Sequence, residues 1–255
     1  MNNLFRLKSL FEKVSNCDSN AEWQKLTDAH ATNPSPMVLS FLNAHAVNLA
    51  CVDPSFFNDL LKANILLRDG VGLEIGLSLI GREPGLNLNG TDLIPQIIKR
   101  YDCQDIVLMG TKEPYLSRAK SYIERTVNSR VVACVDGYRE KDHYRGVIQR
   151  HKPSLVVLGM GMPKQEQIAS YLQDNVDGPM LLINGGAILD FWANRVRRAP
   201  NWIQLIRLEW LYRLLQEPSR LWKRYLVGNP LFLLRVVGLR ILDGRFSEET
   251  PCHSP

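Results

Sequence analysis

The chain has 255 residues, of which 45% are hydrophobic and 22% charged, and its formal net charge is +5 at pH 7. These values indicate an ordinary globular protein of one large domain, or one domain with an appendage. The five cysteines are scattered without a Cys-x-x-Cys pair. This distribution argues against a disulfide framework and a zinc site and favours a reduced, cytoplasmic setting.

The first 36 residues predict a helical lead-in to the main fold. Their opening stretch, MNNLFRLKSLFEKVSNCDSN, contains no long apolar core, so we expect no secretory signal peptide. No uninterrupted apolar stretch of the chain reaches the roughly 18–20 residues that span a bilayer. We therefore expect no transmembrane helix.

Residues 37–200 predict an α/β body. Short runs rich in Val, Leu and Ile, several of them ending in Gly, are typical of strands. The segments between them, such as residues 115–127, carry apolar residues at helical spacing. This alternation predicts a Rossmann-like, mostly parallel sheet with helices on both faces, whose ligands bind beyond the carboxyl ends of the strands. The expected strands are residues 37–42, 63–67, 105–110, 130–135, 154–159 and 180–185.

Residues 201–245 predict a C-terminal amphipathic helical appendage. Trp, Leu and Arg recur there at helical spacing, with expected breaks at Glu217-Pro218 and Asn229-Pro230. Proline is disfavoured inside a helix, so we expect two or three short helices rather than one long one.

The charge of the chain is concentrated near its end. Between Arg195 and Arg245 there are 11 Lys or Arg residues against 3 Asp or Glu. A basic segment on a near-neutral body indicates an anionic partner, either a membrane surface or a nucleic acid. Because the arginines alternate with Trp and Leu at helical spacing, an interfacial amphipathic helix is favoured over nucleic-acid binding. Residues 246–255 are expected to form a disordered tail.

A Gly-Met-Gly-Met-Pro turn at residues 159–163 follows an expected strand and precedes Lys164, Gln165 and Glu166. Glycines let a ligand approach the backbone, a helix N-terminus offers unpaired N–H groups to an anion, and Pro163 suits a first helical turn. Lys164 could add positive charge, and Gln165 could donate to and accept from sugar hydroxyls. The spacing alone fits equally well a plain strand-to-helix connection with a solvated polar face.

Several familiar ligand-binding motifs do not occur in the sequence. There is no G-x-x-x-x-G-K-[ST] motif of a P-loop ATPase, and no G-x-G-x-x-G follows the first expected strand, which weakens a dinucleotide cofactor. There is also no Asp-x-Asp pair to bind a divalent metal beside the phosphates of a sugar nucleotide. We therefore expect no cofactor and no metal site.

Asp69 is the candidate catalytic residue. It follows an expected strand and precedes Gly70 and a helical pattern, a position that suits a general base in a partly apolar cleft. The alternative is an Asp that caps the helix or turns the chain, which is the commoner role of an Asp-Gly pair. Asn43, at the end of the first expected strand, has the same two interpretations.

Taken together, these segments resemble the WecG/TagA/CpsF family of bacterial glycosyltransferases, in consistent order over about residues 37–230. The last blocks are long and specific. The matching segments are Asn43, 68-RDGVGLEIG-76, 90-GTDL-93, 136-DGY-138, 159-GMGMPKQE-166, 186-GAILDFWANRVRRAP-200 and 208-LEWLYRLLQEPSRLWKRYLVGNP-230.

The resemblance implies a specific activity. Such enzymes transfer a sugar from a UDP-sugar to a sugar that is linked by diphosphate to a polyprenol, with inversion and without a metal, at the cytoplasmic face of the membrane. They serve wall teichoic acid, enterobacterial common antigen, capsule and exopolysaccharide assembly, with N-acetylmannosamine, its uronic acid or glucose-type donors. We expect an anionic membrane surface as a further partner, a possible homo-oligomer and no nucleic acid.

The resemblance also implies roles for particular residues. Asp69 falls on the family's proposed base. Arg213, Arg220 and Arg224 are our candidates for binding the acceptor diphosphate or the membrane. The candidate substrate-binding residues are Asn43, Gly70, Gly90, Thr91, Asp92, Gly110, Gly161, Pro163, Lys164, Gln165, Glu166, Gly186, Asp190, Arg197 and Arg198.

The chain departs from the family pattern at two positions. Asn87 stands where the family usually has an Arg, and Phe41 stands where some members have Thr. The loss of that Arg removes a possible diphosphate contact, for which Arg197 or Arg198 could substitute. Two other functions stay open: a Rossmann-like NAD-dependent oxidoreductase, and a catalytically weakened membrane-surface scaffold of the same fold.

Overall fold

The N-terminal segment is helical and packs on the body. The computed structural model of the protein describes residues 3–101, 104–127 and 129–248. Helix α1 (Asn3–Lys13) buries Leu7, Leu10 and Phe11, and it is followed by α2 (Asn20–Asp28) and the 3₁₀ turn η1 (Ala29–Thr32). This lead-in therefore contributes apolar side chains to the core of the molecule.

A six-stranded sheet with the order β2-β1-β6-β5-β3-β4 forms the centre of the fold. Every described strand pair is parallel, so the carboxyl ends of the strands lie along one edge. The predicted α/β, Rossmann-like fold class is confirmed. The strands are β1 (Met37–Leu42), β2 (Ile65–Arg68), β3 (Asp105–Gly110), β4 (Arg130–Asp136), β5 (Leu155–Gly159) and β6 (Leu181–Asn184).

The strand bounds agree with the sequence expectation except at the ends. The second strand was expected at residues 63–67 but begins at Ile65. The reason is local, because the side-chain oxygen of Asn64 accepts the Val38 N–H at 2.8 Å in place of a backbone carbonyl. The strand also extends to Arg68, whose side chain is buried.

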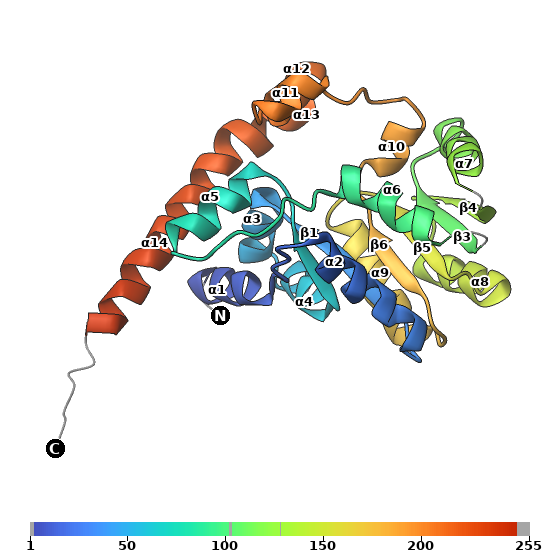
Figure 1. Cartoon of the computed structure of the whole chain (residues 1–255), viewed down its shortest axis with the longest axis horizontal. Coiled ribbons are helices and arrows are strands. Elements are labelled where there is room, and N and C mark those ends of the chain that lie inside the picture. Colours follow the sequence, from blue (N-terminus) through green and yellow to red (C-terminus); the bar gives the residue numbers. More distant parts are fainter. Residues whose placement is uncertain (1–2, 102–103, 128, 249–255) are drawn as a thin grey trace.

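Helices cover both faces of the sheet (Figure 1). Odd-numbered residues of β1, such as Leu39 and Phe41, join the apolar cluster under α2, α6, α7 and α10. Even-numbered residues, such as Val38 and Leu42, face the opposite clusters under α1, α3, α4, α5, α8, α9 and α14. Burial on both faces explains why the strands are continuous apolar runs. The body helices are α3 (Ala44–Val52), α4 (Pro54–Lys62), α5 (Val71–Leu79), α6 (Gly90–Arg100), α7 (Tyr115–Thr126), α8 (Lys141–His151), α9 (Lys164–Asn175) and α10 (Ile188–Trp192).

The C-terminal appendage consists of short helices that lead into one long helix. The short helices are α11 (Asn201–Leu205), α12 (Glu209–Gln216) and α13 (Pro218–Trp222), and a π-helical turn η2 (Lys223–Val227) joins α13 to α14 (Gly228–Glu248). In Figure 1, α14 runs along one side of the body past α3 and α5, in agreement with its packing against both helices.

The expected break at Glu217-Pro218 is present, because Pro218 begins α13. The expected break at Asn229-Pro230 is wrong, since helical structure continues from Pro218 to Glu248. The π turn just before Pro230 widens the helix and accommodates the proline, which lacks an N–H and would otherwise clash with the preceding turn. The helix also extends past the expected start of the tail at residue 246, and residues 249–255 lie outside the described residues.

Among the residues that the structure describes, Pro218–Leu242 is the one helix long and apolar enough to cross a membrane, judged by length and composition alone. The expectation concerned uninterrupted apolar stretches, and Arg235 and Arg240 do interrupt this one, but the average hydropathy of the helix is still high enough for a spanning segment. In this structure, however, the helix lies against the body. Phe232 and Val236 are fully buried, and Arg235 donates to Asn48 of α3.

Candidate active site

A cavity of about 720 Å³ lies at the carboxyl ends of the strands. Parallel α/β sheets bind ligands at this edge, so the cavity is where the sequence placed the site. It is closed on one side by α13 and η2 of the appendage. Of the predicted residues, the cavity is lined by Asn43, Asp69, Gly90, Thr91, Gly161, Lys164, Gln165, Gly186, Asp190, Arg213, Arg220 and Arg224.

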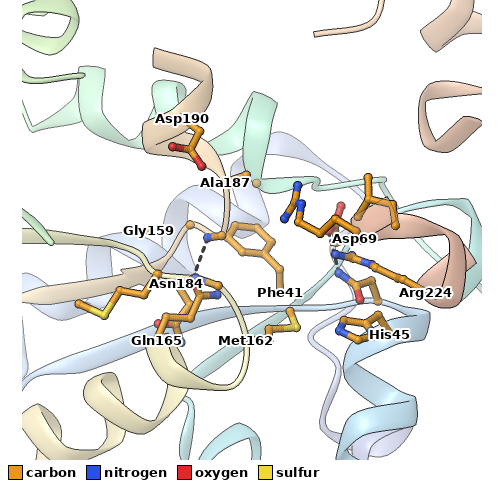
Figure 2. A pocket seen from close by; sticks show the side chains of 18 of the residues that line it. Phe41, His45, Asp69, Gly159, Met162, Gln165, Asn184, Ala187, Asp190 and Arg224 are labelled. Atoms are coloured by element: carbon orange, nitrogen blue, oxygen red, sulfur yellow. Dashed lines mark hydrogen bonds between the residues drawn. The ribbon is translucent and has the colours of Figure 1, made fainter. Parts of the chain in front are cut away.

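Asp69 (Figure 2) forms a hydrogen-bonded pair with Asn43 in this cavity. Each residue follows the carboxyl end of a neighbouring strand, β1 or β2, and the Asp69 N–H donates to the Leu42 carbonyl at 2.8 Å. The Asn43 side-chain oxygen accepts the Ala46 N–H at 3.0 Å and caps α3. With its oxygen held there, the Asn43 amide nitrogen donates to Asp69 Oδ2 at 3.3 Å. Asn43 is therefore both a helix cap and a partner of the candidate base.

The surroundings of Asp69 have opposing effects on the pKa of its carboxyl group. Burial raises the pKa of Asp69, whereas the Asn43 hydrogen bond and the positive charges of Arg224, Arg213 and Arg68 lower it. Burial together with Arg224 lowers the pKa of His45, another cavity residue, to about 4. His45 is thus neutral near pH 7, and the raised pKa of Asp69 suits a general base.

Gln165 connects the two glycine-rich turns of the cavity wall. Its side-chain oxygen accepts the N–H of Gly161 at 3.2 Å and the N–H of Gly186 at 2.9 Å. Its amide nitrogen donates to Glu166 at 2.8 Å. The sequence suggested that Gln165 bonds sugar hydroxyls and that the glycine N–H groups receive phosphate. In this structure these groups instead bond one another and fix the turn after β5 beside the turn after β6.

Glu166 lies behind Gln165 and is 2% exposed. One of its oxygens, Oε2, has no hydrogen-bond partner among the described residues. Burial raises the pKa of Glu166 to about 7, and the nearby Asp59 adds to this effect. Glu166 does not line the cavity. Its carboxyl therefore supports the Gln165 bridge from inside the protein.

Other predicted residues shape the cavity without lining it. A Cβ on Gly110 would lie 2.3 Å from the Gly159 carbonyl oxygen, so only glycine allows β3 and β5 to approach at their carboxyl ends. The Gly70 N–H donates to Asn87 Oδ1 at 3.1 Å, and Pro163 immediately precedes α9. Asn87, the departure from the family pattern, thus binds the backbone directly after Asp69.

Asp190 belongs to a polar network on the wall opposite Asp69. Its Oδ1 accepts a hydrogen bond from Thr111 at 2.8 Å and pairs with Arg195 Nη1 at 3.2 Å. The Arg195 guanidinium also lies 4.8 Å from the centre of the Tyr115 ring. Thr111 and Arg195 line the cavity together with Asp190. The sequence did not single out Thr111 or Arg195.

Arg197 and Arg198, which the sequence offered as substitute contacts for a diphosphate, lie outside the cavity. Arg198 forms a two-pronged ion pair with Asp92 at the start of α6 and lies 3.8 Å from Glu209 of α12. Arg197 is exposed, and its backbone pairs with the Gln216 side chain. None of Asp92, Arg197 and Arg198 lines the cavity. Arg198 instead links the body to the appendage, and Arg195 is the arginine of this segment that reaches the cavity.

The appendage contributes three arginines to the mouth of the cavity. Arg213 lies over the Phe191 ring at 5.5 Å, and its Nε has no hydrogen-bond partner among the described residues. Arg220 pairs with Glu217 of its own turn. Arg224 lies over the Tyr225 ring at 5.5 Å, and no described residue forms a hydrogen bond or ion pair with it. Arg213 and Arg224 therefore present positive charge that no carboxylate of the described residues pairs with directly.

Further cavity residues were missed by reasoning from the sequence. Thr111 follows a strand end directly and could have been found by that signal alone. Arg195 follows α10 on an irregular turn, so no regular spacing relates it to Asp190 in the sequence. Asn48 lies within α3, which begins at the cavity, and no pattern in the sequence marked it as a lining residue. The missed lining residues with polar side chains are His45, Asn48, Thr111, Tyr138, Asn184, Arg195 and Lys223.

The donor set of the site does not resemble a metal centre. The described part of the chain contains no group of three or more His, Cys, Asp or Glu side chains that could hold a metal ion. The polar groups of the cavity are instead amides, hydroxyls, arginines, lysines, the His45 imidazole, and the carboxylates of Asp69 and Asp190.

A parallel sheet with a large polar cavity at the carboxyl ends of its strands defines an α/β enzyme whose substrates bind in that cleft. The particular chemistry follows from comparison with known proteins. Residues 9–245 match the model of the glycosyl transferase WecG/TagA/CpsF family. The chain belongs to this family and is a glycosyltransferase, so the resemblance drawn from the sequence is confirmed and the oxidoreductase alternative is not supported.

Two curated relatives share most of their length with this chain. A protein of Bacillus subtilis (strain 168) is 28% identical over 204 residues, which cover 78% of each chain. A protein of Staphylococcus aureus (strain MW2) is 24% identical over 200 residues, which cover 76% of this chain and 77% of the relative. Each of these relatives is named N-acetylglucosaminyldiphosphoundecaprenol N-acetyl-beta-D-mannosaminyltransferase.

Proposed function

We propose that the protein transfers a hexose or N-acetylhexosamine residue from a UDP-sugar to a sugar linked by diphosphate to a polyprenol, with inversion at the anomeric carbon. The names of the relatives make N-acetylmannosamine the first donor to test and an N-acetylglucosaminyl-diphosphate lipid the first acceptor. This reaction would serve the assembly of a cell-surface polysaccharide.

The observation that carries the proposal is the position of Asp69 in the cavity. Its carboxylate is held by Asn43 beside one wall, and the glycine turns after β5 and β6 form the other side. In an inverting transfer, the acceptor hydroxyl attacks the anomeric carbon from the side opposite the leaving group. Asp69 takes the hydroxyl proton, the new glycosidic bond forms, and UDP leaves with the electron pair of the broken bond. A single base on one side of the sugar is sufficient for this step.

The leaving UDP requires stabilisation of its developing negative charge. Lys164 lines the cavity at the start of α9, whose dipole favours an anion there. Arg195 and Lys223 add positive charge to the lining. We propose that these groups stabilise UDP without a metal ion, in keeping with the amide- and arginine-rich donor set.

The acceptor diphosphate fits the arginines of the appendage. A guanidinium can pair bidentately with phosphate oxygens, and within the described part of the chain no carboxylate forms an ion pair with Arg213 or Arg224. Both arginines also lower the pKa of Asp69. A bound diphosphate would offset their charge and raise the pKa of Asp69 further, which strengthens the base when the acceptor is present.

The appendage also suits contact with the membrane surface where such an acceptor resides. Trp202 is 64% exposed and Leu205 is 82% exposed, and Arg207 follows them closely in the sequence. Exposed aromatic and aliphatic side chains with adjacent basic residues are typical of helices that lie in the lipid interface. We propose a peripheral location on the inner face of the cell membrane. In this arrangement α14 packs on the body rather than crossing the bilayer.

Product analysis tests the proposal directly. Purified full-length protein is incubated with a short-chain polyprenyl-diphosphate N-acetylglucosamine acceptor and with UDP-N-acetylmannosamine, its uronic acid, UDP-N-acetylglucosamine or UDP-glucose. NMR then reports the anomeric configuration. We expect one donor to give an inverted product, in excess EDTA as well as in its absence. No product with any donor would support the non-catalytic scaffold, and activity that EDTA removes and Mg²⁺ or Mn²⁺ restores would overturn metal independence.

A further inference from the structure

Phe41 lines the wall of the cavity, on the strand between the two halves of the site. Strand β1 pairs with β2 on one side and β6 on the other. Asp69 follows β2, and the Gly185-Gly186 turn follows β6. In Figure 2, the Phe41 ring appears between Asp69 on one side and Gly159 and Asn184 on the other. The ring therefore separates the candidate base from the turns on the nucleotide side.

The position of the Phe41 ring is fixed by its packing. The side chain is 5% exposed, yet it lines the cavity. A Cβ added to Gly90, the first residue of α6, would lie 3.3 Å from the edge of this ring. Gly90 has an ordinary helical backbone, so the close ring contact rather than its conformation favours glycine there. The ring is consequently held by β1 below and by the start of α6 beside it.

The geometry of an inverting transfer determines what must occupy the space over Phe41. The attacking oxygen, the anomeric carbon and the leaving oxygen lie approximately in line. The base thus stands at one end of this line and the leaving diphosphate at the other, so the transferred sugar lies between them. Phe41 lies between Asp69 and the turns after β5 and β6, which form the side of the cavity proposed for the nucleotide (Figure 2).

The chemistry of the ring limits which sugar suits this position. A phenyl ring offers no hydrogen-bond donor or acceptor, and its face carries partial negative charge. Such a face packs favourably against the C–H groups of a pyranose and unfavourably against a carboxylate. Asp69 nearby adds negative charge of its own when it is ionised.

We propose that Phe41 is a specificity-determining residue that stacks on the transferred sugar and selects an uncharged pyranose over a hexuronate. The inference rests on the proposed function, because it takes its line of attack from Asp69 and UDP. It assigns Phe41 a role in recognising the sugar and none in binding the nucleotide.

The test compares Phe41→Leu with wild type in binding and in turnover. Leu is apolar and fills much of the same space, so it removes the aromatic face while the cavity wall stays apolar at this position. Calorimetry measures the affinity for UDP and for the UDP-sugar that wild type prefers. We expect an unchanged UDP affinity and a loss of about two- to tenfold in UDP-sugar affinity, as the removal of one aromatic contact predicts. The ratio of kcat/KM for uncharged over uronate donors should fall with it.

Phe56→Leu provides a matched control, because Phe56 is a fully buried aromatic residue of α4 outside the cavity. Phe56→Leu should lower the melting temperature without changing the ratio of kcat/KM for uncharged donors to kcat/KM for uronate donors. Equal losses for UDP and UDP-sugar in Phe41→Leu, or an unchanged donor ratio, would overturn the role of Phe41 while leaving the proposed function intact. Absence of transfer by wild type from every UDP-sugar contradicts the proposed function itself, and the two binding measurements then still decide whether Phe41 contacts the sugar.

Discussion

The Asn43 side chain donates to Asp69 Oδ2 at 3.3 Å while its own oxygen caps helix α3. This double use fixes which end of the amide faces the carboxylate, since the oxygen is already committed to the Ala46 N–H. The pair joins the ends of two adjacent parallel strands. The orientation of the candidate base therefore depends on the register of β1 and β2.

Replacement of Asp69 by Asn should remove the general base with little change in shape. We expect turnover to fall by about 10²–10⁴-fold, the usual contribution of such a group. UDP affinity should persist, because the nucleotide-side turns are held by Gln165 rather than by Asp69. Steady-state kinetics and calorimetry measure the two quantities. Turnover close to that of wild type would show that another residue removes the proton.

Replacement of Asn43 by Ser should change the pH dependence of the reaction. Ser keeps a side-chain oxygen that can cap α3 but removes the amide donor to Asp69. The Asn43 hydrogen bond lowers the pKa of Asp69, so its loss should raise that pKa. A base acts only when deprotonated, and the acidic limb of the kcat/KM profile should therefore move to higher pH in Asn43→Ser. A limb that stays in place, or moves to lower pH, would contradict this coupling.

Replacement of Glu166 by Gln should stabilise the protein at neutral to alkaline pH. Burial raises the pKa of this carboxyl to about 7 from the ordinary value of 4.5. The folded state thus binds a proton more tightly than the unfolded state, and stability falls as the pH rises from about 4.5 to 7. The loss amounts to a few kcal/mol. Gln cannot ionise and keeps an oxygen for the Gln165 bond.

Thermal denaturation at pH 5 and pH 8 measures this effect. We expect a smaller difference between the two melting temperatures in Glu166→Gln than in wild type. Glu12→Gln, a change at an exposed position of α1, serves as the control and should leave the difference as it is. If Glu166→Gln and Glu12→Gln show the same difference in melting temperature between pH 5 and pH 8, the buried Glu166 carboxyl is not the cause of the pH dependence.

Arg195 and Arg197 offer a comparison between two nearby arginines. Arg195 lines the cavity and pairs with Asp190, whereas Arg197 is exposed outside it. Loss of a charged hydrogen-bonding group that contacts a ligand typically costs about 1.5–3 kcal/mol. We therefore expect Arg195→Ala to weaken UDP binding by about tenfold or more and Arg197→Ala to change it little. Calorimetry measures the UDP affinity of each variant. A larger loss of affinity in Arg197→Ala than in Arg195→Ala would support Arg197 as the substrate contact, as the sequence suggested.

The exposed apolar side chains of the appendage should mediate membrane binding. Truncation of the appendage is a poor test, because Phe232, Val236 and Leu239 of α14 are part of the core. A double replacement of Trp202 and Leu205 by Ser leaves that core intact, and we expect it to reduce co-sedimentation with anionic liposomes. Val52→Ser removes a 65% exposed apolar side chain at the end of α3 and serves as the control. Equal sedimentation of the double variant and wild type would show that the appendage is not the anchor.

The sequence by itself determined the fold class, the strands and the edge of the sheet at which the cavity lies. Short apolar runs separated by helical patterns are sufficient to predict a parallel sheet, and the strand ends then mark the cleft. Asn43 and Asp69 were found in this way, because a residue that directly follows a strand end inherits its position from the strand. Lys164 was found from the glycine-rich turn before it, and Asp190 from the family resemblance. Helix α14 was predicted less well, since a local rule about Pro230 could not anticipate the π turn that accommodates it.

Only the tertiary structure decided which arginine reaches the cavity and which polar groups are already bonded. Arg195, Arg197 and Arg198 are equivalent in local sequence, but Asp92 and Glu209, distant along the chain, pair with Arg198. The sequence indicated Gln165 as a sugar ligand, whereas in the structure its side-chain oxygen accepts the N–H of Gly186 in the turn after β6. Hydrogen bonds and ion pairs act over a few ångströms between residues far apart in sequence. Their partners are therefore set by how the elements pack, which no local pattern contains.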